Sequence, residues 1–230
     1  MNNKHFSLVF IIIIIATQAV CQVSHTVRLS YPLAQGTYSE KGPIGTHAGF
    51  GMGLGYRMTK PFNNLKGGGI GYYVGFDASY NLDFGYNDRV ETFEENFSNV
   101  EMSWPLYFNM PVYAGINYTI KSNGKDLLYV RGGPVYNFFK ITNSDIEFDD
   151  NSSKTKFGMS SGLGYSLGTS FRIGKVLSLE VDYLALGEYD IAYTQENSGS
   201  FYGANGTNKG TIVREVSILM ISLGFTNFLN

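Results

Sequence analysis

The stretch "IGYYVGFDASYNLDF", residues 70–84, alternates between two kinds of side chain. Its even positions are apolar or aromatic: Ile70, Tyr72, Val74, Phe76, Ala78, Tyr80, Leu82 and Phe84. Its odd positions are mostly small or polar: Gly71, Tyr73, Gly75, Asp77, Ser79, Asn81 and Asp83. A period of two is typical of a β-strand whose two faces meet different surroundings. The stretch alone does not decide which face points inward.

The same alternation recurs along the chain and predicts eight strands in all. It is clear in three further segments, residues 50–58, 104–120 and 157–173. Weaker versions cover residues 26–38, 127–139, 176–190 and 211–229. Leu184 and Leu186 interrupt the pattern in the seventh strand, as Ile218 and Met220 do in the eighth.

The connections between these strands differ in length in a regular way. Residues 121–126 and 172–176 are short turns, and residues 59–68 form a moderate one. Longer polar connections cover residues 85–103, 142–156 and 194–210. Short turns at one end and long loops at the other are typical of an outer-membrane barrel.

The N-terminal residues indicate export. Lys4 precedes an apolar run, residues 6–15, and the small residues Ala19 and Cys21 follow it, which predicts a signal peptide over residues 1–21. Gln18 and Val20 do not fit a lipoprotein signal, so plain cleavage after Cys21 is favoured over its acylation. The barrel domain is then residues 22–230, and it has no cysteine for a disulfide.

The size of an eight-stranded barrel decides which face points inward. Its interior has room for a modest set of side chains, whereas each strand here carries several large apolar residues on one face. Facing outward, those residues contact lipid, and the tyrosines and Trp104 near strand ends form aromatic girdles. The sequence therefore predicts an all-β, eight-stranded antiparallel transmembrane β-barrel in the bacterial outer membrane. The alternative is a secreted lipocalin-like barrel or β-sandwich with its apolar faces inside.

Strand parity also places charged residues in the lumen. The set contains both signs: Arg57, Asp77, Asp83, Arg131, Arg172, Glu180 and Asp182. Buried charges are costly unless paired, so we expect an ion-pair network that fills the barrel and keeps it from conducting. Arg131 is expected to pair with Glu180 or Asp182. A proton or ion path is the alternative interpretation.

Three segments of the chain resemble a known family. They are "YFNMPVYAGINY" (107–118), "LLYVRGGPVYNFF" (127–139) and "ISLGFTNF" (221–228). Together they are similar to the small outer-membrane barrel proteins of Bacteroidota, the PorT-like group, which is related in architecture to OmpX-type barrels. The resemblance implies an eight-stranded barrel, insertion by the barrel assembly machinery, and for some members a link to secretion machinery. Leu229 and Asn230 follow Phe228, where the family typically ends on an aromatic residue.

The sequence gives no pattern for catalysis. A hydrolase of the Ser/His/acid type needs a His beside its nucleophile, and the mature chain keeps only His25 and His47. His47 could meet a loop serine and Glu188, but a single His at a strand end is more often structural. Neither HExxH nor a P-loop occurs, and the two GxSxG matches, residues 158–162 and 164–168, fall inside the strand predicted over residues 157–173. We therefore expect no enzyme and no cofactor.

The polar loops are the remaining place for function. One loop holds a weak candidate set of metal ligands, the oxygen donors Asp145, Glu147, Asp149 and Asp150. A structural or interaction role is predicted for the acidic loops, with an envelope or extracellular protein as partner. The alternatives are a narrow transporter or channel and a component of a secretion or envelope-assembly complex. Nucleic acid is excluded as a partner because the formal net charge is −2 and no basic stripe occurs.

Overall fold

The computed structural model describes residues 23–40, 47–62, 68–103, 105–122, 125–199 and 206–226. The expected signal peptide, residues 1–21, lies outside the described residues, as do Trp104 and residues 227–230. Most of the described chain is β-strand. Among the described residues, no helix is long and apolar enough to cross a membrane.

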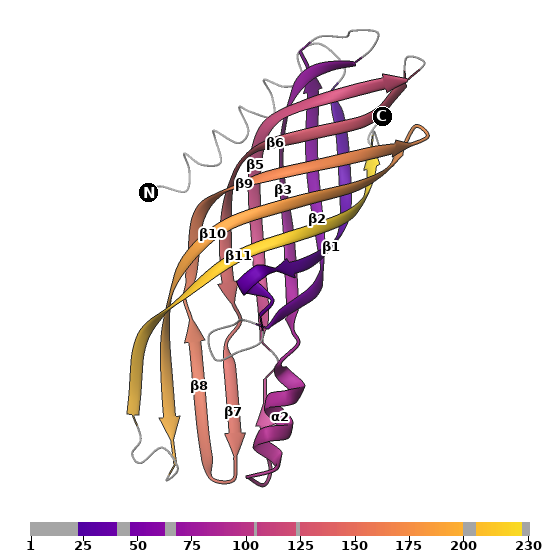
Figure 1. Ribbon diagram of the computed structural model, residues 1–230. Coiled ribbons are helices and arrows are strands. Elements are labelled where there is room, and N and C mark those ends of the chain that lie inside the picture. The colour runs from indigo at the N-terminus through magenta and orange to yellow at the C-terminus, as the bar shows by residue number, and fades with distance from the viewer. Residues whose placement is uncertain are drawn as a thin grey trace.

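Eight antiparallel strands close into a ring, which confirms the expected barrel (Figure 1). In ring order they are β1 (Ser24–Gln35), β2 (Ala48–Pro61), β3 (Gly68–Asp83), β5 (Leu106–Ser122), β6 (Lys125–Ile141), β9 (Met159–Ile173), β10 (Leu177–Ser198) and β11 (Gly206–Thr226). Each strand pairs with the next, and β11 pairs with both β10 and β1. The ring therefore leaves no open edge along the part of the barrel where β11 contacts β1.

The two ends of the barrel differ. At the inner end, β1 begins, β11 ends, a short turn joins β9 to β10, and only two residues separate β5 from β6 in the sequence. The outer end carries five further elements: the 3₁₀ turn η1 (Gly36–Tyr38), α2 (Tyr86–Glu94), β4 (Glu101–Met102), β7 (Ser144–Phe148) and β8 (Asn151–Phe157). By the usual arrangement of such barrels, the inner end faces the periplasm and the outer end faces the exterior.

The outer connections are more ordered than the sequence predicts. Residues 85–103 and 142–156 were expected to be polar loops, but they form α2, β4 and most of a β7–β8 hairpin. Phe148 is fully buried there, with ring centroids 4.4 Å from Phe97 and 5.6 Å from Phe93. This small aromatic core packs α2 and the residues after it against β7.

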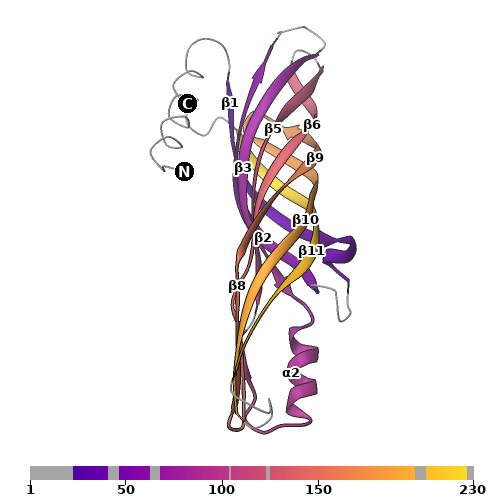
Figure 2. The same ribbon diagram turned by 90° about the vertical axis from the view of Figure 1, so that its left-hand side faces the viewer.

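A single-layer sheet extends beyond the barrel at the outer end. β10 and β11 are 22 and 21 residues long, about twice what a tilted membrane-spanning strand needs. Their outer halves continue into a sheet in which β10 pairs with β8, β8 with β7 and β7 with β4. Figure 2 shows this extension nearly edge-on, with α2 at one side. We call it the outer sheet.

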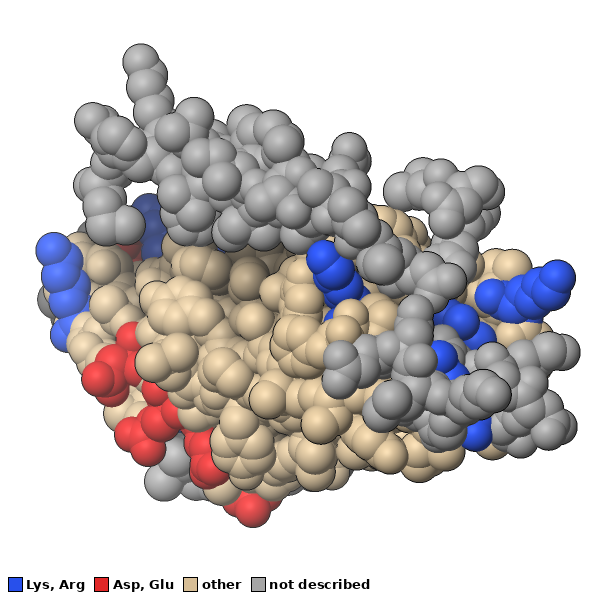
Figure 3. All heavy atoms as spheres, turned by 90° about the horizontal axis from the view of Figure 1, so that it is seen from above, with Lys and Arg blue, Asp and Glu red and all other residues tan. Residues whose placement is uncertain are grey.

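The outward orientation of the apolar faces is clear from exposure. Leu54, Ile116 and Leu163 are 60%, 61% and 74% exposed, whereas Asp77 and Asn109 on the opposite face are buried. Seen from the inner end, most of the visible described surface consists of uncharged residues (Figure 3). Such a wall suits a lipid environment.

The two halves of the interior differ, because the outer half combines buried polar residues such as Asn109 and Asp83 with buried apolar ones. Leu184, Leu186, Ile218 and Met220 are each at most 2% exposed and join one buried apolar cluster in the outer half. A bulge at Gly187 (φ +93°) then shifts the inward parity of β10. What looked like breaks in the alternation are therefore apolar residues that face an apolar interior.

Candidate functional site in the barrel interior

A cluster of six charged side chains fills the inner half of the lumen. Its members are Arg28, Arg57, Asp77, Arg131, Glu180 and Asp182, each at most 4% exposed. They project from β1, β2, β3, β6 and β10. Three guanidinium groups balance three carboxylates, so the cluster as a whole is neutral. We call it the ion-pair cluster.

Arg28 lies at the centre of the ion-pair cluster. Its guanidinium nitrogens lie 3.1 Å from Asp77 Oδ2 and 3.1 Å from Glu180 Oε2, and a third ion pair joins it to Asp182. It also donates a hydrogen bond of 2.8 Å to the Tyr113 hydroxyl. The sequence analysis missed Arg28, although its even position in β1, beside Ser30, places it on the inward face.

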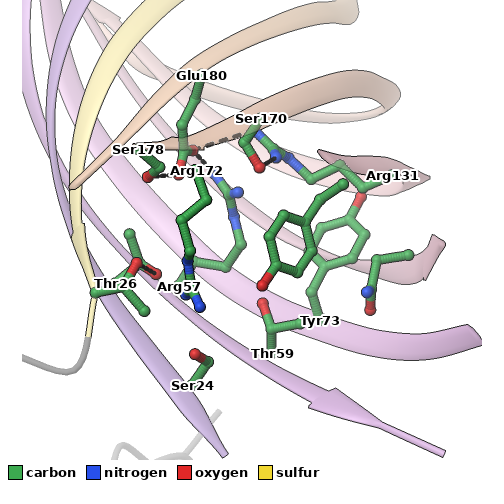
Figure 4. Close-up of a pocket in the computed structure, with 13 residues that line it drawn as sticks. Ser24, Thr26, Arg57, Thr59, Tyr73, Arg131, Ser170, Arg172, Ser178 and Glu180 are labelled. Atoms are coloured by element: carbon green, nitrogen blue, oxygen red, sulfur yellow. Dashed lines mark hydrogen bonds and ion pairs between the residues drawn. The ribbon is translucent and has the colours of Figure 1, made fainter. Parts of the chain in front are cut away.

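Arg57 and Arg131 share the same two acids. Arg57 lies 2.7 Å from Glu180 Oε2, and Arg131 lies 3.2 Å from that oxygen and 2.7 Å from Asp182. Figure 4 shows Arg57 and Arg131 both reaching toward Glu180. The structure thus brings Arg131 to both of the acids named for it from strand parity.

Glycines on neighbouring strands make room for the carboxylates. A Cβ atom at Gly168 would lie 1.8 Å from Asp182 Oδ1, and one at Gly55 would lie 1.7 Å from Asp77 Oδ1. Both glycines sit directly beside those acids in the strand register. The absence of a side chain at Gly55 and Gly168 therefore leaves the space that the Asp77 and Asp182 carboxylates occupy.

Two of the seven expected lumen charges lie apart from the ion-pair cluster. Asp83 is buried near the outer end, where it pairs with Arg89 of α2 and accepts a hydrogen bond from Tyr107. Arg172 lies at the inner end, with its guanidinium carbon 5.6 Å from the centre of the Tyr129 ring. Strand parity gives the face of a residue but not its height in the barrel.

An aromatic side chain from η1 closes the outer half of the lumen. Tyr38 is fully buried, packs edge-on against Tyr107 and Phe139, and accepts a hydrogen bond of 3.2 Å from Asn109. Burial raises the pKa of the Tyr38 hydroxyl well above its usual value, so this group stays neutral. The barrel is thus filled at two levels, by charged groups in its inner half and by aromatic and aliphatic groups in its outer half.

A small polar cavity opens at the inner end of the barrel, on the inner side of the ion-pair cluster. Its volume is about 30 Å³, room for one or two water-sized groups. Hydroxyl groups line much of it: Ser24, Thr26, Thr59, Tyr73, Tyr129, Ser170, Ser178 and Thr226. Arg57, Arg131, Arg172, Glu180 and Asn117 complete the wall. We call it the mouth cavity.

The histidines are placed in structural settings. The Nδ1 atom of His25 lies 2.5 Å from the Tyr56 hydroxyl, on the barrel wall near the inner end. His47 has φ +53° and lies against Gly85, just before α2, while Glu188 is exposed on β10. Nothing in this arrangement gives positive support for catalysis.

The structure does not assemble the weak metal candidates. Asp145 and Glu147 lie on β7, whereas Asp149 and Asp150 lie in the turn that follows. Glu147 pairs with Lys154, and Asp149 accepts a hydrogen bond from the Ser98 backbone. Within the described residues, no three His, Cys, Asp or Glu side chains gather as a metal site would require.

Comparison with known proteins identifies a family. The family model described as outer membrane protein beta-barrel domain matches residues 6–212. Among solved structures, a major outer membrane protein of Thermus thermophilus is 13% identical, with a TM-score of 0.47, over 90% of this chain and 100% of that one. Ail of Yersinia pestis, in complex with the heparin analogue sucrose octasulfate, is 11% identical, with a TM-score of 0.46, over 90% and 99% of the two chains. OprG of Pseudomonas aeruginosa is 17% identical, with a TM-score of 0.42, over 88% and 95%. No curated protein sequence matches the chain.

Proposed function

Because the chain belongs to the outer membrane protein beta-barrel domain family, we propose that it is a non-conducting barrel that holds the outer sheet and α2 at the cell surface for interaction with a partner. The chain is a bacterial outer-membrane protein by its family and its eight-stranded ring. The role in interaction rests on one observation: the lumen is filled at two levels while strands β10 and β11 continue well beyond the barrel.

The filled lumen supports the non-conducting part of the proposal. The ion-pair cluster occupies the inner half, and the apolar cluster with Tyr38 occupies the outer half. An eight-stranded barrel has little space beyond its own side chains. Purified protein in planar bilayers should therefore show no stable, porin-sized current steps. Such steps, if they persist after the outer sheet is deleted, would favour the narrow transporter instead.

The charge of the outer elements indicates what kind of partner fits. Residues 85–103 carry five acids, Asp88, Glu91, Glu94, Glu95 and Glu101, against Arg89 as the one base. Asp88, Glu91, Glu94 and Glu95 are exposed on or just after α2. A surface of this sign attracts a basic surface on an envelope or extracellular protein. The partner is therefore expected to bind through Lys- or Arg-rich regions.

Crosslinking on intact cells, followed by purification of the barrel, tests this partner. The variant Glu91→Gln/Glu94→Gln/Glu95→Gln should lose the crosslinked protein, whereas Lys60→Gln/Lys175→Gln, at the inner end, should keep it. Binding that is equal in both variants would show that the acids around α2 are not the docking surface. Recovery of a secretion or envelope-assembly component would assign the barrel to that complex.

Two finer assignments belong to the same proposal. The segments at 107–118, 127–139 and 221–228 support membership of the PorT-like group of Bacteroidota. The charged, apolar and small residues of the N-terminus support a signal peptide over residues 1–21 and a barrel domain over residues 22–230. N-terminal sequencing of the protein purified from outer membranes checks the cleavage after Cys21.

A further inference from the structure

The mouth cavity carries more positive than negative charge on its wall. Arg57, Arg131 and Arg172 line it, against Glu180 as the one carboxylate in the lining. Its remaining polar groups are hydroxyls and the Asn117 amide, which can donate hydrogen bonds. Arg57 and Arg131 belong to the neutral ion-pair cluster, so Arg172 gives the cavity its excess of positive charge. A concave site with an excess of one sign concentrates ions of the opposite sign.

Arg57 has fewer acceptors than the other two arginines of the ion-pair cluster. Arg131 donates to both oxygens of Asp182 and to Ser170, and Arg28 donates to Asp77, Tyr113 and Ser222. One oxygen, Glu180 Oε2, serves Arg28, Arg57 and Arg131 at distances of 3.1, 2.7 and 3.2 Å. Arg57 has five N–H donors, and both of the acids that it contacts, Glu180 at 2.7 Å and Asp182 at 3.5 Å, lie at its Nη2 atom. Arg57 is 4% exposed, and its Nε has no hydrogen-bond partner among the described residues. A buried donor without an acceptor is costly, and an anion would supply one.

We propose that the mouth cavity is a binding site for a small monovalent anion, with chloride as the physiological candidate, which enters from the inner end of the barrel. The volume of about 30 Å³ selects for size: it accepts a halide, whereas a tetrahedral oxyanion would protrude from the mouth. Arg57 and Arg172 supply the charge, and hydroxyls such as those of Thr59 and Ser170 supply further donors. This site is independent of the partner proposed for the outer sheet.

The unfolding of the purified barrel at constant ionic strength tests the site. The unfolding midpoint should rise with chloride concentration and saturate, and it should not rise with methanesulfonate, which is too large for the cavity. Arg172→Gln should raise the half-saturating chloride concentration by at least tenfold, since it removes one cationic wall group. Lys175→Gln is the matched control, because it removes an exposed charge from the neighbouring turn.

A crystal of the unaltered protein grown in bromide gives a second measurement, which does not depend on how a variant folds. An anomalous peak within hydrogen-bond distance of Arg57 or Arg172 is the expected result. An equal rise of the midpoint in chloride and methanesulfonate would reduce the effect to general screening and overturn the proposal. Unchanged chloride dependence in Arg172→Gln would do the same. A stronger response to phosphate than to chloride would overturn the assignment to a halide.

Discussion

Replacing Arg28 by methionine should destabilise the barrel more than almost any other single substitution. Arg28 and Asp77 are each 1% exposed and form an ion pair of 3.1 Å. Removing one member of a buried pair leaves an uncompensated charge, which costs about 3–5 kcal/mol. Arg28 also contacts Glu180 and Asp182, so the remaining cluster would hold three carboxylates and two guanidinium groups. The cost is therefore expected at the upper end of that range.

A second substitution separates charge balance from packing. Adding Asp77→Asn to Arg28→Met restores neutrality, and the double variant should recover about 2 kcal/mol of the loss through the coupling of the two sites. Urea titration in lipid vesicles, read by the gel mobility of the folded and unfolded forms, measures both values. Lys175→Met, on an exposed turn, should change stability by no more than about 0.5 kcal/mol. The reasoning fails if Arg28→Met costs less than about 1 kcal/mol, or if the double variant is less stable than the single one.

Three further substitutions address other parts of the molecule. Gly168→Ala places a methyl group against Asp182 and should lower the free energy of unfolding in the same gel assay by about 1–3 kcal/mol through overpacking. No change would mean that the Asp182 carboxylate can move aside. Tyr38→Ala should cost about 3–5 kcal/mol through the cavity it leaves and still give a silent barrel in planar bilayers, because the ion-pair cluster remains closed; porin-sized steps in this variant would contradict that arrangement. Phe148→Ala should expose residues 86–103 to limited proteolysis while the heat-modifiable barrel persists, and protection equal to that of the unaltered chain would show that the aromatic core does not hold α2.

The barrel could be predicted from the sequence because its main signal is local. Alternation along residues 70–84 reports the surroundings of the two faces of one strand, and its recurrence gives the number of strands. The same parity singled out Arg57, Asp77, Arg131, Glu180 and Asp182, five of the six members of the ion-pair cluster. Arg28 was equally accessible to this reasoning, since it follows the parity of its own strand.

Other features depend on contacts that alternation does not report. Near the middle of β10 and β11, Leu184 and Ile218 face an apolar part of the interior while their neighbours face outward, so both faces are apolar and the period of two disappears. The order of residues 85–103 depends on Phe93 and Phe97 meeting Phe148, more than fifty residues further along the chain. The height of Asp83 and Arg172 in the barrel depends on strand tilt and register, which a face assignment does not contain.

The position of Arg28 in the first strand has a consequence for how the barrel is completed. Its acidic partners Glu180 and Asp182 lie on β10, and Ser222, to which it also donates a hydrogen bond, lies on β11. In a sheet that has not yet closed, the seam between β1 and β11 separates Arg28 from these groups. Arg28 then keeps Asp77 of β3 on its own side of the seam but lacks both of its partners on β10, whose carboxylates lose one of their guanidinium groups. When β1 pairs with β11, Arg28 reaches Glu180, Asp182 and Ser222 together. The complete set of ion pairs therefore stabilises only the closed ring in the correct register.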